Sequence, residues 1–186
     1  MAPNVKKEES ENVLMIGTIP ITKTTEISLY LDTYRGKRYA NIRKFARSAK
    51  YTGATKQGIK LSEKNLSDIL AVRSGILDRC NSPEEAELCR SRKFPGTDIV
   101  LKVTLYEGKY GLDIRAIYKQ EDGSEGFGRG IRLPVEKADN ILELLAAMAA
   151  QFHAADSAEQ PRVQEPKNEY PSKKNSDLPP TVKKYF

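Results

Sequence analysis

The chain has 186 residues and a mass of 20.8 kDa, a length that allows one large domain or two small ones. Only 39% of the residues are hydrophobic, and no run approaches the roughly 18 apolar residues of a membrane helix. A helical membrane protein is therefore excluded, and a packed middle with disordered ends is expected. The net charge of +6 favours a polyanionic partner. The first 12 residues lack the hydrophobic stretch of a signal peptide, which predicts an intracellular protein, nuclear in a eukaryote and in the cytoplasm or nucleoid of a bacterial or viral system.

Period-two alternation of apolar and polar side chains, which is typical of β-strands, marks the first third of the chain. A first candidate strand at residues 13–21 is interrupted by Gly17 and Pro20. The next strands are expected at residues 27–32, 39–47 and 58–61, with a glycine turn at residues 34–37. Ser62 is the expected N-cap of a closing helix with an apolar stripe. This order predicts a ββββα unit over residues 13–79.

A second unit is expected over residues 96–153. Its strands are predicted at residues 99–105, 110–119 and 130–133, followed by a helix that begins near Pro134 and carries an apolar stripe from Ala138 to Met148. Residues 88–95 show no clear counterpart of the first candidate strand of the first unit.

The segment between the two units is predicted to be a linker over residues 80–95, in which Ser82 to Glu85 look like the start of a short helix. The ends of the chain, residues 1–12 and 154–186, are predicted to be disordered, because the tail is rich in Pro, Lys, Glu and Ser and has no apolar period. The terminal pair Tyr185-Phe186 is either a docking peptide or part of that disordered tail.

An internal repeat relates the two units at one offset of 72 residues, without a gap. The offset superimposes a hairpin turn, an Ile-Arg pair and a Gly-Ile-x-Leu strand. The matched pairs are Leu29 with Leu101, Tyr34 with Tyr106, Gly36 with Gly108, Lys37 with Lys109, Ile42-Arg43 with Ile114-Arg115, Gly58-Ile59 with Gly130-Ile131, and Leu61 with Leu133. The two units are therefore expected to share one fold.

Strand alternation places aromatic and cationic side chains together on the face opposite the helix. In the first unit this face is expected to carry Tyr30, Tyr34, Tyr39, Arg43, Phe45, Arg47 and Lys60, and in the second Lys102, Tyr106, Arg115, Lys119 and Arg132. A surface that binds single-stranded nucleic acid needs this composition, because its cations contact the phosphates and its rings stack on unpaired bases. The alternative is a solvated sheet whose rings shield cross-strand neighbours.

Charge is divided unequally between the two units. Residues 26–61 contain nine Lys or Arg against two acidic residues, whereas residues 98–133 contain six of each. The first unit is therefore predicted to be the anchor for a polyanion.

The sequence contains no constellation that predicts catalysis, metal binding or a cofactor. Cys80 and Cys89 are too far apart for a C-x-x-C pair, and His153 is the only histidine. The segment from Gly126 to Gly130 lacks the G-x-G-x-x-G spacing of a phosphate-binding loop and is expected to be a flexible turn.

The sequence resembles the positive cofactor four family of transcriptional coactivators. In the second unit the resemblance lies in Tyr110-Gly111-Leu112-Asp113-Ile114-Arg115 and Gly128-Arg129-Gly130-Ile131-Arg132-Leu133 before a helix. In the first unit it lies in Tyr34-Arg35-Gly36-Lys37, Asn41-Ile42-Arg43 and Gly58-Ile59-Lys60-Leu61. It covers residues 13–150 and implies an α+β fold in which curved four-stranded antiparallel sheets with C-terminal helices pair about a two-fold axis. Because two units share one chain, it predicts an intramolecular pseudo-two-fold dimer, with further oligomerisation left open.

The resemblance also implies a function, which is binding of single-stranded or melted DNA in transcription, replication or repair, together with the machinery of those processes. The implied binding residues are Tyr34, Lys37, Arg43 and Lys56 in the first unit and Tyr106, Lys109, Arg115, Tyr118 and Arg129 in the second. The chain departs from the family pattern at Ala46, Gln57 and Glu107, where the family has an aromatic residue, a cation and a hairpin cation.

Three other interpretations stay open from the sequence. The chain could bind RNA, or it could be a protein-interaction scaffold whose basic sheet docks an acidic partner. The purine-rich-element-binding proteins also repeat a ββββα unit and bind single strands, but their repeats lack this Gly-Ile-x-Leu strand.

Overall fold

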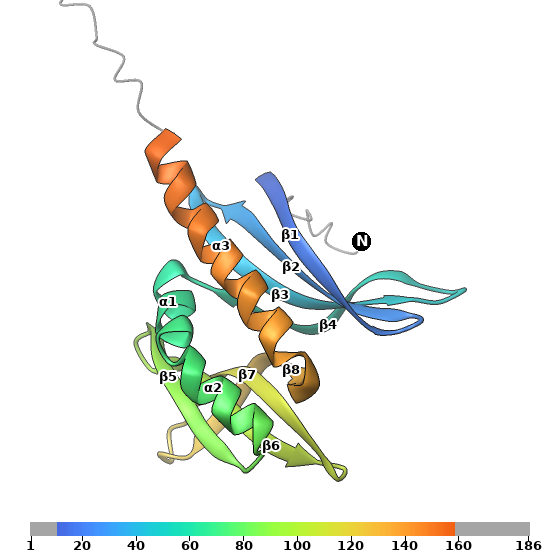
Figure 1. Ribbon diagram of the computed structural model, residues 1–186. Helices are drawn as coiled ribbons and strands as arrows, with labels where there is room; N and C mark the ends of the chain where they lie inside the picture. The colour runs from blue at the N-terminus through green and yellow to red at the C-terminus, as the bar shows by residue number, and fades with distance from the viewer. Residues whose placement is uncertain (1–10, 159–186) are drawn as a thin grey trace, which may run out of the picture.

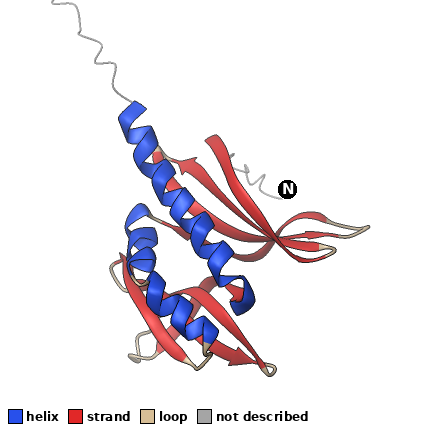
Figure 2. Ribbon diagram, viewed as in Figure 1, coloured by secondary structure: helices blue, strands red, loops and turns tan. Residues whose placement is uncertain are grey.

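The computed structural model describes residues 11–158 and has an α+β fold with two four-stranded antiparallel sheets (Figure 1). The strand order is β1-β2-β3-β4 in one sheet and β5-β6-β7-β8 in the other, so each sheet is a meander of strands that are consecutive in the chain. The helices gather on one side of the two sheets (Figure 2). The tandem arrangement of two sheet-and-helix units that the sequence predicts is thus present.

The elements of the first unit are β1 (Glu11–Thr22), β2 (Thr25–Tyr34), β3 (Lys37–Arg47), β4 (Thr52–Leu61), α1 (Glu63–Ala71) and α2 (Arg73–Asn81). Those of the second unit are β5 (Ala86–Phe94), β6 (Thr97–Tyr106), β7 (Lys109–Lys119), β8 (Glu125–Pro134), the short 3₁₀ helix η1 (Val135–Lys137) and α3 (Ala138–Ala158). Strands β2 and β6 are 10 residues each and β3 and β7 are 11 residues each. Both pairs start and end 72 positions apart, so the offset of the sequence repeat is also the offset of the strands.

The range predicted to be a linker contains strand β5, which pairs antiparallel with β6. The expectation that the second unit lacks a counterpart of β1 is therefore wrong. The reason is that register shifts between Glu87 and Cys89 and between Arg92 and Phe94 break the strict alternation by which a strand is recognised in a sequence. The helix expected from Ser82 is also absent, because α2 ends at Asn81 and residues 82–85 have no regular structure.

The predicted disordered ends fall mostly outside the described residues, as do Tyr185-Phe186 and the side chain of His153. Helix α3 continues to Ala158, past the predicted start of the tail at residue 154. Alanines at three of these positions favour the helix, which explains why it runs on beyond its buried stripe.

The buried side chains of both units form a single core. On the first sheet this core takes Leu29 and Ile42, which are Cα partners, and on the second it takes their counterparts Leu101 and Ile114. The helices contribute the stripes predicted from the sequence, which include Leu66 of α1 and Leu142 of α3. One core shared by two units means that their apolar faces are closed together.

The closing helices contact the sheet of the other unit. Helix α3, which belongs to the second unit, packs on β1 and β2 of the first (Figure 1). A Cβ atom at Gly17 of β1 would lie 2.7 Å from Leu144 Cδ2, so the glycine allows α3 to approach the sheet closely. Helix α1 of the first unit packs chiefly on β5 of the second, and β4 lies against β8.

Asn65 fixes the contact between α1 and β5. It is fully buried, and its side-chain oxygen accepts from the backbone N–H of the N-cap Ser62 at 3.3 Å, which forms the capping box. Its Nδ2 donates to Ser91 Oγ at 2.7 Å and to the Arg92 carbonyl oxygen at 3.1 Å, both on β5. The side-chain amide of Asn65 therefore caps a helix of the first unit and forms hydrogen bonds with a strand of the second.

Replacing Asn65 with alanine is expected to lower the free energy of unfolding by about 2–3 kcal/mol, because the change removes the side-chain half of the capping box and both hydrogen bonds from Asn65 to β5. Urea denaturation of the full chain measures the loss. Ser67→Ala is the matched control, since Ser67 lies exposed on the same helix. Equal losses in the two variants would contradict this role of Asn65.

Candidate nucleic-acid interface

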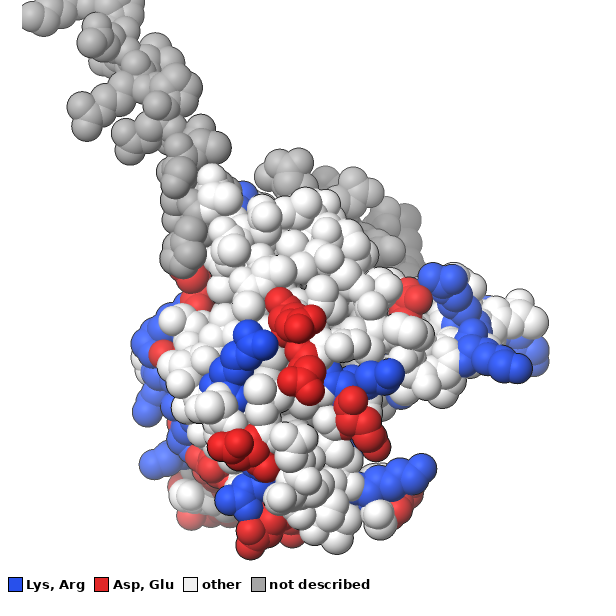
Figure 3. Space-filling model, in the orientation of Figure 1, with Lys and Arg blue, Asp and Glu red and all other residues white. Residues whose placement is uncertain are grey.

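Each sheet has a polar face, made by the side chains that alternate with the buried ones. On the first sheet Tyr30, Asn41 and Lys60 are neighbours across β2, β3 and β4. We call the following set the first polar face: Ser28, Tyr30, Asp32, Tyr34, Lys37, Tyr39, Asn41, Arg43 and Lys60. On the helix side acidic and basic side chains are mixed over most of the surface, and cations stand on the projecting end formed by the β1–β2 and β3–β4 turns (Figure 3).

A glycine lies opposite the central arginine of each polar face. Gly58 is the Cα partner of Arg43, and Gly130 is the Cα partner of Arg115. A Cβ atom at Gly58 would lie 3.1 Å from Arg43 Cγ, and one at Gly130 would lie 3.0 Å from Arg115 Cβ and Cγ. The missing side chain therefore makes room for the arginine stem to lie along the sheet, which gives a physical role to the Gly-Ile-x-Leu motif.

Lys60 is held between two tyrosine rings on the first polar face. Its Nζ lies 5.4 Å from the ring centre of Tyr34 and 5.1 Å from that of Tyr39. The same Nζ pairs with Asp32 Oδ2 at 2.9 Å, and the Asp32 side chain is almost fully buried. Rings and cations are thus interleaved here, as the alternation of the sequence predicts.

Carboxylates pair with two cations on the polar face of the second sheet, Lys102 and Arg115. Arg115 pairs with Asp113 at 3.1 Å, and Lys102 pairs with Glu87 at 3.1 Å. Hydrogen bonds from Arg90 hold the pKa of Glu87 below its ordinary value, so this carboxylate stays charged. Two of the six cations of residues 98–133, Lys102 and Arg115, are therefore held in direct ion pairs.

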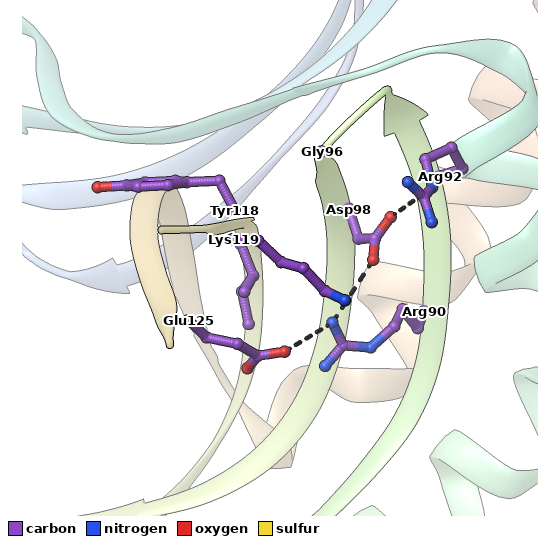
Figure 4. A pocket seen from close by; sticks show the side chains of 8 residues that line it. Arg90, Arg92, Gly96, Asp98, Tyr118, Lys119 and Glu125 are labelled. Carbon is purple, nitrogen blue, oxygen red and sulfur yellow. Dashed lines mark ion pairs between the residues drawn. The ribbon is translucent and has the colours of Figure 1, made fainter. Parts of the chain in front are cut away.

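An arginine pair on β5 shows the same neutralisation. Arg90 reaches Asp98 at 3.6 Å and Glu125 at 3.0 Å, and Arg92 reaches the other oxygen of Asp98 at 2.8 Å (Figure 4). These side chains line a cavity of about 110 Å³ with Tyr118, whose ring points away from the ion pairs. The two arginines of this cavity are therefore engaged within the protein.

A larger cavity of about 490 Å³ lies where the two units meet. We call it the junction cavity. Its lining residues are Tyr34, Lys37, Arg38, Tyr39 and Lys60 from the first sheet, Ser62 and Asn65 from the start of α1, and Lys93 and Phe94 from β5. Four cations and three aromatic rings therefore surround one cavity, which neither unit could form alone.

The junction carries an excess of positive charge. Desolvation lowers the pKa of Lys93, and the nearby charges of Arg129 and Lys60 lower it further. Within residues 11–158, neither Lys93 nor Arg129 takes part in an ion pair. Cations crowded in this way favour an anionic ligand.

The structure divides the nine predicted binding residues among several places. Tyr34 and Lys37 line the junction cavity, and Arg129 lies near it. Arg43 and the exposed Lys56 lie farther along β3 and β4. The remaining predicted residues are distributed over the second unit: Tyr106 and Lys109 at the β6–β7 turn, Arg115 beside a pocket of about 260 Å³, and Tyr118 beside the Arg90 ion pairs.

Sequence reasoning missed Lys93 and Phe94, because it assigned their segment to a linker. The signal that could have found them is the offset of 72 residues, since β1 continued by that offset falls on residues 83–94. A search for a strand with bulges at this place would have brought both side chains into the second sheet.

Burial raises the pKa of the thiols of Cys80 and Cys89, which disfavours the thiolate that a nucleophile requires. Among the described residues no three His, Cys, Asp or Glu side chains lie together as a metal-binding group. No helix in that part of the chain is long and apolar enough to span a membrane.

No model of a protein family matches this sequence, and a search of curated proteins finds none with significant similarity.

Replacing Gly130 with alanine is expected to lower the free energy of unfolding by about 1–3 kcal/mol, because the new Cβ would lie 2.9 Å from the Ile114 carbonyl oxygen and crowd Arg115. Thermal or urea unfolding measures the change. Gly75→Ala is the control, since a Cβ there meets nothing within 4 Å and the residue lies inside α2, where alanine is the better helix former. A loss at Gly75 as large as that at Gly130 would argue against the glycine–arginine fit.

Proposed function

We propose that this chain binds single-stranded DNA through the polar faces of its two sheets, without strong sequence preference. The observation that carries the proposal is the first polar face, where tyrosine rings are interleaved with cations and the carboxylate of Asp32 is paired with Lys60. The next carboxylate along this face of β2, Glu26, is paired with Arg47 at 3.1 Å. Cations contribute by releasing counterions from the phosphates, and partly exposed rings stack on unpaired bases. Duplex DNA would not offer its base faces to those rings.

The resemblance to the positive cofactor four family supports a role in transcription regulation or genome maintenance. In this proposal Tyr34, Lys37, Arg43 and Lys56 form the stronger half of the site. Tyr106, Lys109, Arg115, Tyr118 and Arg129 form the weaker half, because Asp113 and the other carboxylates of the second unit offset its cations. The chain requires no cofactor for this function.

We also propose that the two units pair about a pseudo-two-fold axis within one chain. The contacts between the units favour this arrangement, since they join elements that correspond to one another: β4 with β8, and α1 with α3. The exchange of the helices, α1 onto β5 and α3 onto β1, has the same reciprocal character.

An intramolecular pair predicts that the chain is a monomer in solution. Sedimentation equilibrium is expected to give a mass near 20.8 kDa over a wide range of protein concentrations. A tight dimer at every concentration would contradict the intramolecular pair.

Binding is tested with a labelled mixed-sequence oligonucleotide of about 20 nucleotides, as a single strand and as a duplex, at about 50 mM and about 200 mM salt. The affinity for the single strand is expected to be higher than that for the duplex. It is also expected to fall by about tenfold or more at the higher salt concentration. Lys37→Ala with Arg43→Ala is expected to weaken binding and flatten the salt dependence more than Lys109→Ala with Arg115→Ala. The reason is that Asp113 already pairs with Arg115, whereas Asn41 occupies the corresponding position beside Arg43.

Three results would count against the proposal. Tighter binding of the duplex would exclude recognition of unpaired bases. An RNA strand of the same sequence that binds more tightly than the DNA would make RNA the ligand. Equal effects of the two double variants, or a larger effect of the second, would show that the anchor is not the first unit.

A further inference from the structure

The junction cavity is built so that a side chain of the second unit faces the binding residues of the first. Phe94 stands at the end of β5 and is 52% exposed, which is unusual for a ring that has a core available nearby. Lys93 Nζ lies 5.8 Å from its ring centre. A cation beside an accessible ring is the pairing that a nucleotide uses, with the phosphate on one and the base on the other.

The position of these two side chains is fixed from the first unit. Asn65 donates to the carbonyl oxygen of Arg92 at 3.1 Å, immediately before Lys93 in the chain. The same amide caps α1, whose N-cap Ser62 directly follows the last residue of β4. The backbone at the end of β5 is therefore held in place relative to the first polar face before any ligand binds, which lowers the entropy lost on binding.

The positive charges around the junction cavity favour a polyanion as its ligand. Lys60 has Asp32 as its partner, but Lys37 and Lys93 form no ion pair with any residue from 11 to 158. The neighbouring Arg129 comes from β8 of the second unit, so cations of both units converge on one place. An acidic peptide would satisfy these charges but would not use the exposed ring of Phe94 for stacking.

We propose that Lys93 and Phe94 complete the nucleic-acid site of the first unit, and that one single strand crosses between the two units at the junction cavity. One base stacks on Phe94, and the adjoining phosphate is held by Lys93 with Lys37 and Lys60. This inference rests on the proposed function and adds to it a continuous path and two residues outside the family-derived set.

The test measures the affinity of the full chain for the labelled single strand with variants of these two residues. Phe94→Leu keeps an apolar side chain but removes the ring, and it is expected to weaken binding by about fivefold or more, whereas Phe94→Tyr retains wild-type affinity. Lys93→Ala is expected to lower the slope of log affinity against log salt by about 0.7, the value for one phosphate of a single strand, and Lys93→Arg to restore it.

Controls match each change in exposure or charge. Leu105→Ala removes an apolar side chain that is 47% exposed on the second sheet, and Lys137→Ala removes one positive charge from η1. Both are expected to bind like the wild type. Phe94 and Lys93 are exposed, so circular dichroism and the thermal midpoint are expected to stay unchanged in their variants.

Wild-type affinity in both Phe94→Leu and Lys93→Ala, with single-strand binding intact, would overturn this inference and leave the proposed function standing. A chain that binds no single strand at all would overturn both. Displacement of the oligonucleotide by polyglutamate at equal charge concentration, with Phe94→Leu unaffected, would identify an acidic protein as the ligand of the junction and would also overturn the inference.

Discussion

The fold depends on the exchange of closing helices between the two units. A four-stranded meander has one apolar face, and it must be covered before the sheet is stable in water. Here α3 of the second unit covers β1 and β2 of the first, and α1 of the first unit packs on β5 of the second. Neither sheet is closed by its own helix alone, so the two units share one core.

The same exchange creates the candidate site. Because α1 is held against β5 by Asn65, the end of β5 is brought beside the first polar face, and the junction cavity forms between them. The packing of the two units and the shape of the junction cavity thus depend on one buried amide. Within residues 11–158 the helices lie on the other side of the sheets, so none of them covers the polar faces.

Much of this arrangement could be predicted from the sequence, because the repeat aligns the strand pattern of the first unit with that of the second. Each alignment supports an assignment that one unit alone would leave weak. The hairpin β2–β3 and its counterpart β6–β7 follow the predicted offset from end to end, and Ser62 caps α1 as expected. Strand β5 could not be recognised, because its bulges disrupt the alternation and its outward arginines resemble those of a loop. The residues of the junction cavity depend on the contact between the units, and no local pattern encodes that contact.

The opposed glycine and arginine show how a strongly cationic side chain is accommodated on a sheet. An arginine stem that lies flat across the neighbouring strand needs the space of a side chain, and Gly58 and Gly130 supply it at matching positions. The repeat therefore preserves the steric arrangement of both polar faces, while the charge around each arginine differs.

Placing both units on one chain permits this difference in charge. In a dimer of identical chains, a substitution beside one arginine appears beside the other, so both halves gain or lose the same carboxylate. In this chain Arg115 has Asp113 at 3.1 Å, whereas Asn41 stands at the corresponding place in the first unit. Because the two polar faces differ in charge, the two ends of the molecule attract a polyanion to different extents. Because a nucleic-acid strand has a direction, a site with two unequal halves distinguishes its two orientations, which a site with exact two-fold symmetry cannot do.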